Sequence, residues 1–410
     1  MWRGLEQQSQ KFPTLRPTTS NTYMKRFIIF LLAACTFAGH VYGQSLIISP
    51  EINLPKDSVT KTQLISALNG FLAQKEKPHA ENKFILKEEF LATSLLLDEL
   101  KGLEKNAKLK DDNYYKPYLA NVSALGDDVF STRINYMADV IGSPVLRSSF
   151  RLMAKKVDGA FYIYSPLKQS TKGWKTKKLG NITFHYQDTL NQAGAKKYYN
   201  TVSLYDKKLH TPTPPVALYL CDNVAAALQV LGVDYNLQYN GLAWGTLSVH
   251  ENDSLLLVNG WNAYKSRFDP HDLFHERLRQ VVNPDIINRP VDEGCAYLYG
   301  GSWGISWPEI LRLFKEYAAA NPNADWLTLY INEKNKNFSE GSKPLKISYA
   351  INALVVQKYD KEKGGAPMEL LTCGKVEKGD ENYFKALEKV SGVTKANFNS
   401  EVWKLVRNAQ

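Results

Sequence analysis

The sequence predicts an α+β protein in which a part with an antiparallel sheet precedes a part with a small sheet and a mainly helical C-terminal region. Leucines recur at helical spacing early in the chain, short aromatic and β-branched runs lie between residues 150 and 186, and helical periods dominate after residue 269. With 410 residues, of which 44% are hydrophobic and 12% aromatic, the chain is expected to form two or three folded domains. This composition argues against intrinsic disorder.

The first 43 residues have the pattern of an export leader. Residues 24–26 (Met-Lys-Arg) supply positive charge, residues 27–38 are apolar and uncharged, and Gly43 is a small residue at the expected cleavage point. At 12 residues the apolar run is too short to span a bilayer. The sequence therefore predicts a signal segment over residues 1–43, with Met24 as an alternative start, and export to the periplasm or the extracellular space.

A second interpretation of the leader rests on residues 32–35 (LAAC), which resemble a bacterial lipobox. In that case Cys35 carries a lipid that anchors the protein to the outer membrane, and otherwise Cys35 is one more apolar residue of the leader. This lipid is the one membrane contact that the sequence predicts. The other cysteines, Cys221, Cys295 and Cys373, form no CxxC pair, so no thiolate zinc site is indicated and one disulfide stays open.

The charge of the chain does not indicate nucleic-acid binding. The formal net charge is +10, and residues 1–43 hold five basic residues and one acidic residue, which leaves +6 for the remainder. No basic run interleaved with aromatic residues marks one face, so no nucleic-acid partner is predicted. The sequence also has neither a G-x-S-x-G motif nor a glycine-rich phosphate loop.

Residues 44–209 are predicted to form an N-terminal α+β domain. Apolar residues at helical spacing indicate helices within residues 64–100. Strand-like runs follow at residues 150–156, 160–164 and 181–186. The dipeptide Asp158-Gly159 between the first two runs predicts a tight hairpin of an antiparallel sheet.

The proline-rich segment 211–215 is the predicted linker, and residues 210–410 are predicted to form the second domain. This domain is expected to open with a strand at residues 216–220, a helix at 224–231 closed by Gly232, and two strands at 243–249 and 255–259. Beyond residue 269 the periodicity predicts helices at 270–282, 291–299, 307–320, 324–334 and 347–359, and two short helices near the C-terminus.

Two segments of this second part carry the chemistry. Asp269 and Pro270 predict a helix start, which places His271 and His275 one turn apart on the same face. Glu293 follows 18 residues after His275, near the start of the next predicted helix. Two histidines from one helix and a carboxylate from the next form a known catalytic zinc geometry with an open fourth position.

This order of strands and helices, with H-x-x-x-H on one helix and E-G-x-A (residues 293–296) on the next, resembles the gluzincin metallopeptidases of the peptidase MA-like group. The resemblance covers residues 210–405, about half of the chain. It implies one zinc ion per chain held by His271, His275 and Glu293, and hydrolysis of a peptide bond in a peptide or protein substrate. It also implies that Asp292 supports the ligands by hydrogen bonding.

The chain departs from the family pattern at the general base. The family has H-E-x-x-H, whereas this chain has H-D-L-F-H with Asp272 as the candidate base. An aspartate is one methylene shorter, so its carboxylate falls about 1 Å short of the usual water position, and misplacement on this scale costs about 100-fold in rate. For the oxyanion donor that the family uses, Tyr349 is the leading candidate and Tyr297 the second.

The resemblance further implies that the strand before the histidine helix borders the substrate cleft, with Ala243 and Thr246 facing an extended peptide. Three functions stay open. In the first, the chain is an exported zinc metallopeptidase. In the second, it is a catalytically impaired relative, zinc-binding or metal-free, that acts as a recognition module at the cell envelope, and in the third it is a structural envelope protein whose histidine pair arises by chance.

Overall fold

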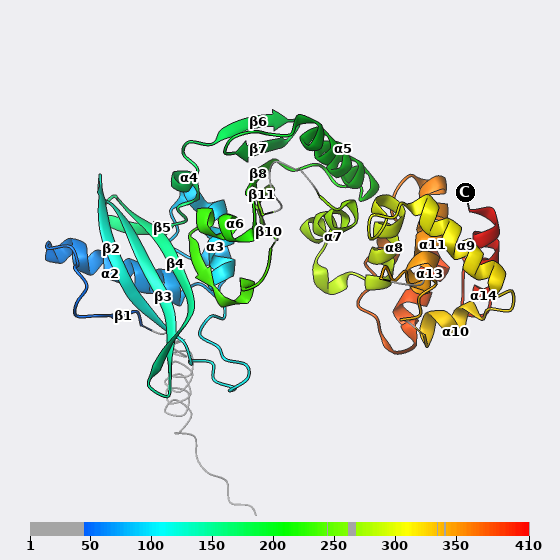
Figure 1. The fold of residues 1–410 in the computed structure, drawn as a ribbon, viewed down its shortest axis with the longest axis horizontal. Coiled ribbons are helices and arrows are strands. Elements are labelled where there is room, and N and C mark those ends of the chain that lie inside the picture. The colour runs from blue at the N-terminus through cyan, green and yellow to red at the C-terminus, as the bar shows by residue number, and fades with distance from the viewer. Residues whose placement is uncertain (1–44, 244, 261–267, 334, 340–341, 410) are drawn as a thin grey trace, which may run out of the picture.

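The computed structural model describes residues 45–409 except 244, 261–267, 334 and 340–341. These residues form an α+β fold drawn out along one axis, with one sheet at the N-terminal end, a second sheet in the middle and helices at the C-terminal end (Figure 1). The predicted fold class is confirmed. The predicted leader 1–43 and its Cys35 lie outside the described residues. Within the described ranges, no helix is long and apolar enough to cross a membrane.

The first sheet joins six of the described strands. Hydrogen bonds order five of them as β1-β2-β3-β4-β5, and β9 pairs with β4. The strands are β1 (Ile47–Ile48), β2 (Lys116–Gly126), β3 (Val129–Val140), β4 (Ser143–Val157), β5 (Ala160–Tyr164) and β9 (Val233–Asn236). The pairs from β2 to β5 are antiparallel, as the sequence predicts, whereas β1 runs parallel to β2.

The hairpin between β4 and β5 has the predicted two-residue turn. Val157 pairs with Ala160, and the intervening Asp158 and Gly159 have φ angles of 49° and 82°. Positive φ at both central residues is the type I′ geometry, whose twist matches that of the flanking strands.

Two long helices in the N-terminal part pack on this sheet. The helix α2 (Ser58–Ala73) starts at Asp57, whose side chain accepts a hydrogen bond from Thr60 N at 2.7 Å. The helix α3 (Phe90–Leu100) is buried along most of its length and contacts both β5 and the middle sheet. The first and second sheets therefore share a continuous apolar core that contains side chains from both.

The middle sheet has the strand order β10-β11-β8-β7-β6. Its strands are β6 (Lys175–Leu179), β7 (Ile182–Tyr186), β8 (Val216–Leu220), β10 (Thr246–Glu251) and β11 (Ser254–Asn259). The strands β7, β8 and β11 are parallel, and β10 is an antiparallel edge strand. Since β6 and β7 precede the proline-rich segment 211–215 and β8 follows it, a boundary at residue 210 divides one sheet.

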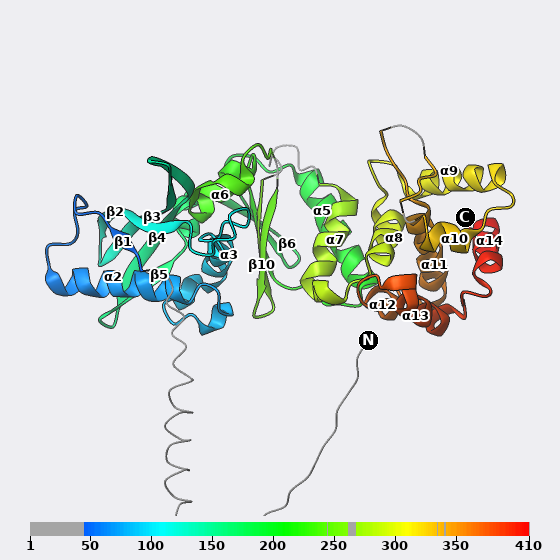
Figure 2. The same ribbon diagram turned by 90° about the horizontal axis from the view of Figure 1, so that it is seen from below.

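Helices cover both faces of the middle sheet. The helix α6 (Val224–Leu231) packs with α3 on one face, and α5 (Gln192–Lys208) and α7 (Pro270–Val281) lie on the other (Figure 2). The Tyr205 hydroxyl on α5 donates to Pro270 O at 2.9 Å, and a buried ion pair joins Asp206 to Arg277. These two contacts fix the orientation of α7 against α5.

The C-terminal region is helical, as the sequence predicts. Its main helices are α8 (Arg289–Gly300), α9 (Trp307–Ala320), α10 (Trp326–Ile331), α11 (Ile347–Lys363), α12 (Met368–Leu371), α13 (Glu381–Ser391) and α14 (Phe398–Asn408). They share with α5, α7 and one face of the middle sheet a second apolar core. The cysteines Cys221, Cys295 and Cys373 are free thiols.

Candidate metal centre

The helix α7 positions two histidines in its N-terminal half. The Asp269 side chain accepts a hydrogen bond from His271 N at 2.9 Å, and Pro270 occupies the first turn, as the sequence predicts. Leu273, Phe274 and Leu278 are buried in the core beneath the helix. This packing leaves His271 and His275 on the side of α7 that faces α8.

The helix α8 positions the third candidate ligand. Pro290 lies in its first turn, and Glu293 follows one turn into the helix. A Cβ atom at Gly294 would lie 2.5 Å from Asn352 Cβ and 2.8 Å from Ala353 N, both on α11. The glycine of the E-G-x-A motif therefore allows α8 and α11 to approach closely, and this contact fixes the height of Glu293 opposite the histidines.

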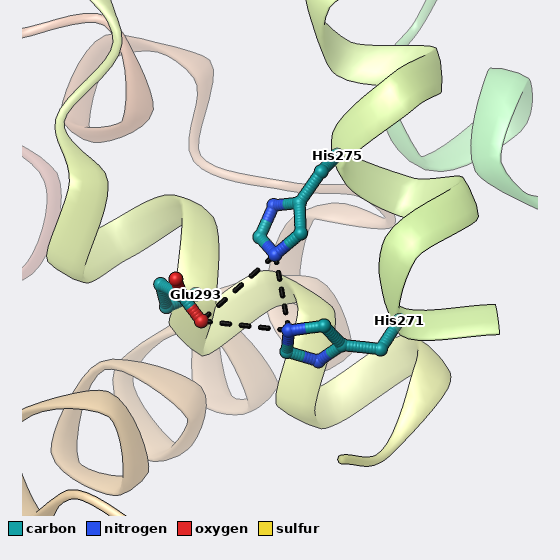
Figure 3. Close-up of side chains that lie close together, drawn as sticks. All are labelled: His271, His275 and Glu293. Carbon is teal, nitrogen blue, oxygen red and sulfur yellow. Dashed lines mark hydrogen bonds and ion pairs between the residues drawn. The ribbon is translucent and has the colours of Figure 1, made fainter. Parts of the chain in front are cut away.

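Three ligand atoms converge on one point between α7 and α8 (Figure 3). The Nε2 atoms of His271 and His275 lie 3.0 Å apart. Glu293 Oε2 lies 3.5 Å from His271 Nε2 and 3.9 Å from His275 Nε2. The three side chains are 11% to 13% exposed, so they are largely buried but still reach solvent.

The outer nitrogens of both imidazoles are held by acceptors. His271 Nδ1 lies 2.7 Å from Gly301 O, and His275 Nδ1 lies 2.7 Å from Asp292 Oδ1. A backbone carbonyl can only accept, so the proton of a neutral His271 is on Nδ1, and the carboxylate favours the same tautomer of His275. Each Nε2 then directs a lone pair at the other ring. Two lone pairs 3.0 Å apart need a proton or a cation between them.

The spacing of the three atoms fits a tetrahedral metal ion. Nitrogen and oxygen ligands lie at about 2.0–2.2 Å from zinc, which places pairs of ligand atoms in a tetrahedral site roughly 3.4 Å apart. The three separations of 3.0, 3.5 and 3.9 Å bracket that value. The described residues thus contain a His-His-Glu group that is able to hold a metal ion, as the sequence predicts.

His271, His275 and Glu293 form a cluster of titratable groups. Burial lowers the pKa of His271, but the Glu293 carboxylate and the Gly301 carbonyl outweigh this effect and raise it. Burial raises the pKa of Glu293, but the two histidines and Arg289 outweigh this effect and lower it. Glu293 is therefore ionised at neutral pH, which is the state that a metal ligand requires.

Two glycines at the end of α8 shape the same site. A Cβ atom at Gly300 would lie 2.6 Å from His271 N, so α7 and α8 meet there without a side chain between them. Gly301 has φ 77° and ψ −159°, a backbone conformation that residues other than glycine avoid. This conformation ends the helix and places the Gly301 carbonyl oxygen beside His271 Nδ1. These two glycines therefore end α8 and also orient the candidate ligand His271.

Asp272, the candidate base, is an exposed residue in the first turn of α7 next to His271. It makes no hydrogen bond or ion pair that the described part of the chain reveals, so its carboxylate is available to solvent. Glu276 lies one turn after Asp272 on the same side of α7. Burial, with the nearby Asp272 carboxylate, raises the pKa of Glu276 to about 7.

Of the two candidate tyrosines, Tyr297 lies next to His271, and Tyr349 lies next to Tyr297. The Tyr297 ring is 5.9 Å from the His271 ring and 5.7 Å from the Tyr349 ring. Tyr297 is buried, and its hydroxyl accepts from Lys346 N at 3.3 Å, so it has a structural partner. Tyr349 is half-buried, and its hydroxyl neighbours the Arg289 guanidinium.

The predicted substrate-edge residues lie at the start of β10. Thr246 is the first residue of this edge strand and is half-buried. Ala243 precedes the strand and is exposed in irregular structure. The predicted start of this strand at residue 243 is therefore wrong by three residues, and Ala243 contributes no pairing to the described sheet.

Three residues of the site lie outside the sequence prediction. Arg279 Nη2 lies 3.8 Å from Asp292 Oδ2, Arg289 Nη2 lies 3.4 Å from Glu293 Oε1, and Gly301 supplies a carbonyl. The spacing of Arg289 and Glu293, one helical turn apart, is the one sequence signal that indicates such a contact.

The fold and these contacts define an α+β protein with a candidate two-histidine, one-glutamate metal centre. No protein-family model matches this chain. No curated protein matches it either.

Proposed function

We propose that this protein is an exported zinc metallopeptidase of gluzincin type. The observation that carries the proposal is the convergence of His271 Nε2, His275 Nε2 and Glu293 Oε2, with both outer imidazole nitrogens held by acceptors. Two imidazoles and one carboxylate suit zinc, and histidines four apart on one helix with a glutamate from the next match the family pattern. Export is proposed from the leader pattern in residues 1–43.

Each residue has a distinct task in this proposal. Zinc supplies Lewis acidity and lowers the pKa of water when it is bound by the three ligands. Asp272 takes a proton from the attacking water, and Tyr349 donates a hydrogen bond to the oxygen of the scissile carbonyl as negative charge develops. Asp292 and the Gly301 carbonyl hold the imidazoles in the tautomer that leaves Nε2 free.

A second function is favoured by Asp272 itself. Its carboxylate is one methylene shorter than that of the glutamate in the family pattern and is exposed. The chain is then an impaired relative that binds metal, or none, and recognises a peptide or protein at the cell envelope without cleaving it.

Cleavage of a peptide library by the metal-loaded mature protein separates the two functions. For a peptidase, we expect chelator-sensitive cleavage that falls in Asp272→Ala and rises in Asp272→Glu. If neither the wild type nor Asp272→Glu cleaves any peptide while zinc is bound, the peptidase function is excluded and the recognition function stands. Elemental analysis of the same samples distinguishes zinc from iron, which also binds two histidines and a carboxylate.

A further inference from the structure

A small cavity adjoins the metal centre on the side of Arg289. Its volume is about 230 Å³, and it lies between the first turn of α8, the start of α11 and the segment before α13. Tyr330, Ser348 and Asp380 are buried and form its floor. Arg289 and Lys346 line it from its more exposed side.

The cavity is linked to the metal ligands by direct contacts. Arg289 lines the cavity and also lies 3.4 Å from Glu293 Oε1, the carboxylate oxygen that is turned away from the histidines. Tyr349 lines it as well, and its ring contacts Tyr297, whose ring contacts His271. The cavity therefore shares Arg289 and Tyr349 with the surroundings of the candidate metal ligands.

The charges around the cavity favour an anion. The Arg289 side chain is 78% exposed and contacts Glu293 and the Tyr349 hydroxyl, so more than half of its five N–H donors are available. Lys346 Nζ lies 5.1 Å from the centre of the Tyr349 ring and donates to Asn335 Oδ1 at 3.1 Å, which leaves two of its donors. The lining also contains one buried carboxylate, that of Asp380, which offsets one of these two positive charges. Two cations therefore border the cavity at its open side.

The size of the cavity limits what it holds. Pockets for whole small-molecule ligands have volumes of about 300–1,000 Å³. A volume of about 230 Å³ instead suits one side chain or one chain end. An arginine fork beside a lysine suits a carboxylate, because the guanidinium offers paired N–H groups to its two oxygens.

We propose that this cavity is a subsite for a carboxylate of the peptide substrate, bound by Arg289 and Lys346 beside the metal centre. The proposal rests on the proposed peptidase function and names its substrate class. The carboxylate comes from an acidic side chain or from the C-terminus of the peptide. Its aliphatic part packs against Tyr349 and the cavity floor.

Binding of four related peptides to the zinc-loaded mature protein tests this subsite without any need for cleavage. The peptides are acetyl-tetra-alanine amide, the same peptide with one glutamate or one glutamine at the third position, and acetyl-tetra-alanine with a free C-terminus. Calorimetric titration is expected to show about tenfold tighter binding of the glutamate peptide or of the free-acid peptide than of the two neutral ones. Tighter binding of the glutamate peptide assigns the carboxylate to an acidic side chain, and tighter binding of the free-acid peptide assigns it to the C-terminus.

Matched variants assign the preference to the cavity. Arg289→Gln and Lys346→Gln are each expected to remove most of the preference. Lys346 is the decisive position, because it does not contact a candidate metal ligand among the described residues. Lys363→Gln is the control, since Lys363 is an exposed lysine at the far end of the same helix, about 25 Å away. Its preference is expected to equal that of the wild type.

The outcomes separate the subsite from the peptidase function. Equal affinity for all four peptides, absence of measurable binding by any of them, or an unchanged preference in Lys346→Gln overturns the subsite. A protein that cleaves neutral peptides without a carboxylate preference retains the peptidase function and loses the subsite. A carboxylate preference that depends on Lys346 in a protein that never cleaves supports the subsite and overturns the peptidase function.

Discussion

His271 and His275 face each other through their Nε2 atoms at 3.0 Å, while the opposite nitrogen of each ring is bonded to an acceptor of its own. This relationship distinguishes the pair from two histidines on a solvated helix. A surface pair has no reason to be fixed in matching tautomers, whereas a pair of metal ligands requires it. Each contact that maintains the arrangement leads to a measurable expectation.

Asp292→Asn tests the contact that orients His275. The substitution keeps the size of the side chain and removes the negative charge that lies beside His275 Nδ1. We therefore expect zinc affinity to fall about 10–100-fold. Competition with a zinc-chelating dye measures the change. Asp285→Asn is the control, because Asp285 is 77% exposed and pairs with a surface lysine. Equal zinc affinity in Asp292→Asn and the wild type would show that the carboxylate does not support the ligand.

Gly294→Ala tests the close approach of α8 and α11. The new methyl group would lie 2.5 Å from Asn352 Cβ, so the helices must separate, and we expect a loss of about 1–3 kcal/mol in the free energy of unfolding. Denaturant unfolding measures it. Gly173→Ala is the control, since a Cβ atom there meets nothing within 4 Å. If both variants unfold at the same denaturant concentration, the contact does not limit the position of α8.

A buried histidine outside the metal centre gives a pH prediction. His79 Nε2 lies 3.0 Å from Asp98 Oδ1, and His79 Nδ1 lies 2.7 Å from Glu251 Oε1 at the end of β10. The Asp98 contact, helped by Glu251 and opposed by burial and by Lys101, raises the pKa of His79. Its stabilising contribution is therefore complete below the ordinary histidine pKa of about 6.5 and is lost as the pH rises through the higher folded-state pKa.

We accordingly expect the free-energy difference between wild type and His79→Gln to shrink as the pH rises above about 6.5, by about 1.4 kcal/mol for each unit of the shift. Unfolding curves across pH 5–9 measure it. Taking the difference between the two proteins removes the contribution of other groups, such as Glu276. A difference that stays constant or grows with pH would mean that His79 is neutral in the folded protein.

The sequence was sufficient to bring the three candidate ligands together, but it indicated only part of their surroundings. Helix capping at Asp269 and the four-residue spacing placed His271 and His275 on one face, because helix geometry is local. The position of Asp292 beside Glu293 indicated a supporting carboxylate. Arg279, Arg289 and the Gly301 carbonyl were not identified as parts of the site, because which neighbour a side chain or carbonyl meets depends on how two helices pack.

The domain organisation shows the same limit. The prolines at residues 211–215 suggested a linker, but β7 and β8 on either side of them pair directly in one sheet. Prolines suit any segment that makes few backbone hydrogen bonds, and a connection from a helix to a strand is such a segment. The short β9 pairs with β4 across the same predicted boundary, which no local pattern indicates.

Metal content measures the central claim most directly. Elemental analysis of the folded mature protein, purified at neutral pH and incubated with zinc before desalting, is expected to give about one zinc per chain. The ion should be lost in His275→Ala and retained in His250→Ala, which changes an exposed histidine at the far end of β10. A folded wild-type protein that retains no zinc, or a His275→Ala variant that retains as much as the wild type, would contradict the metal centre.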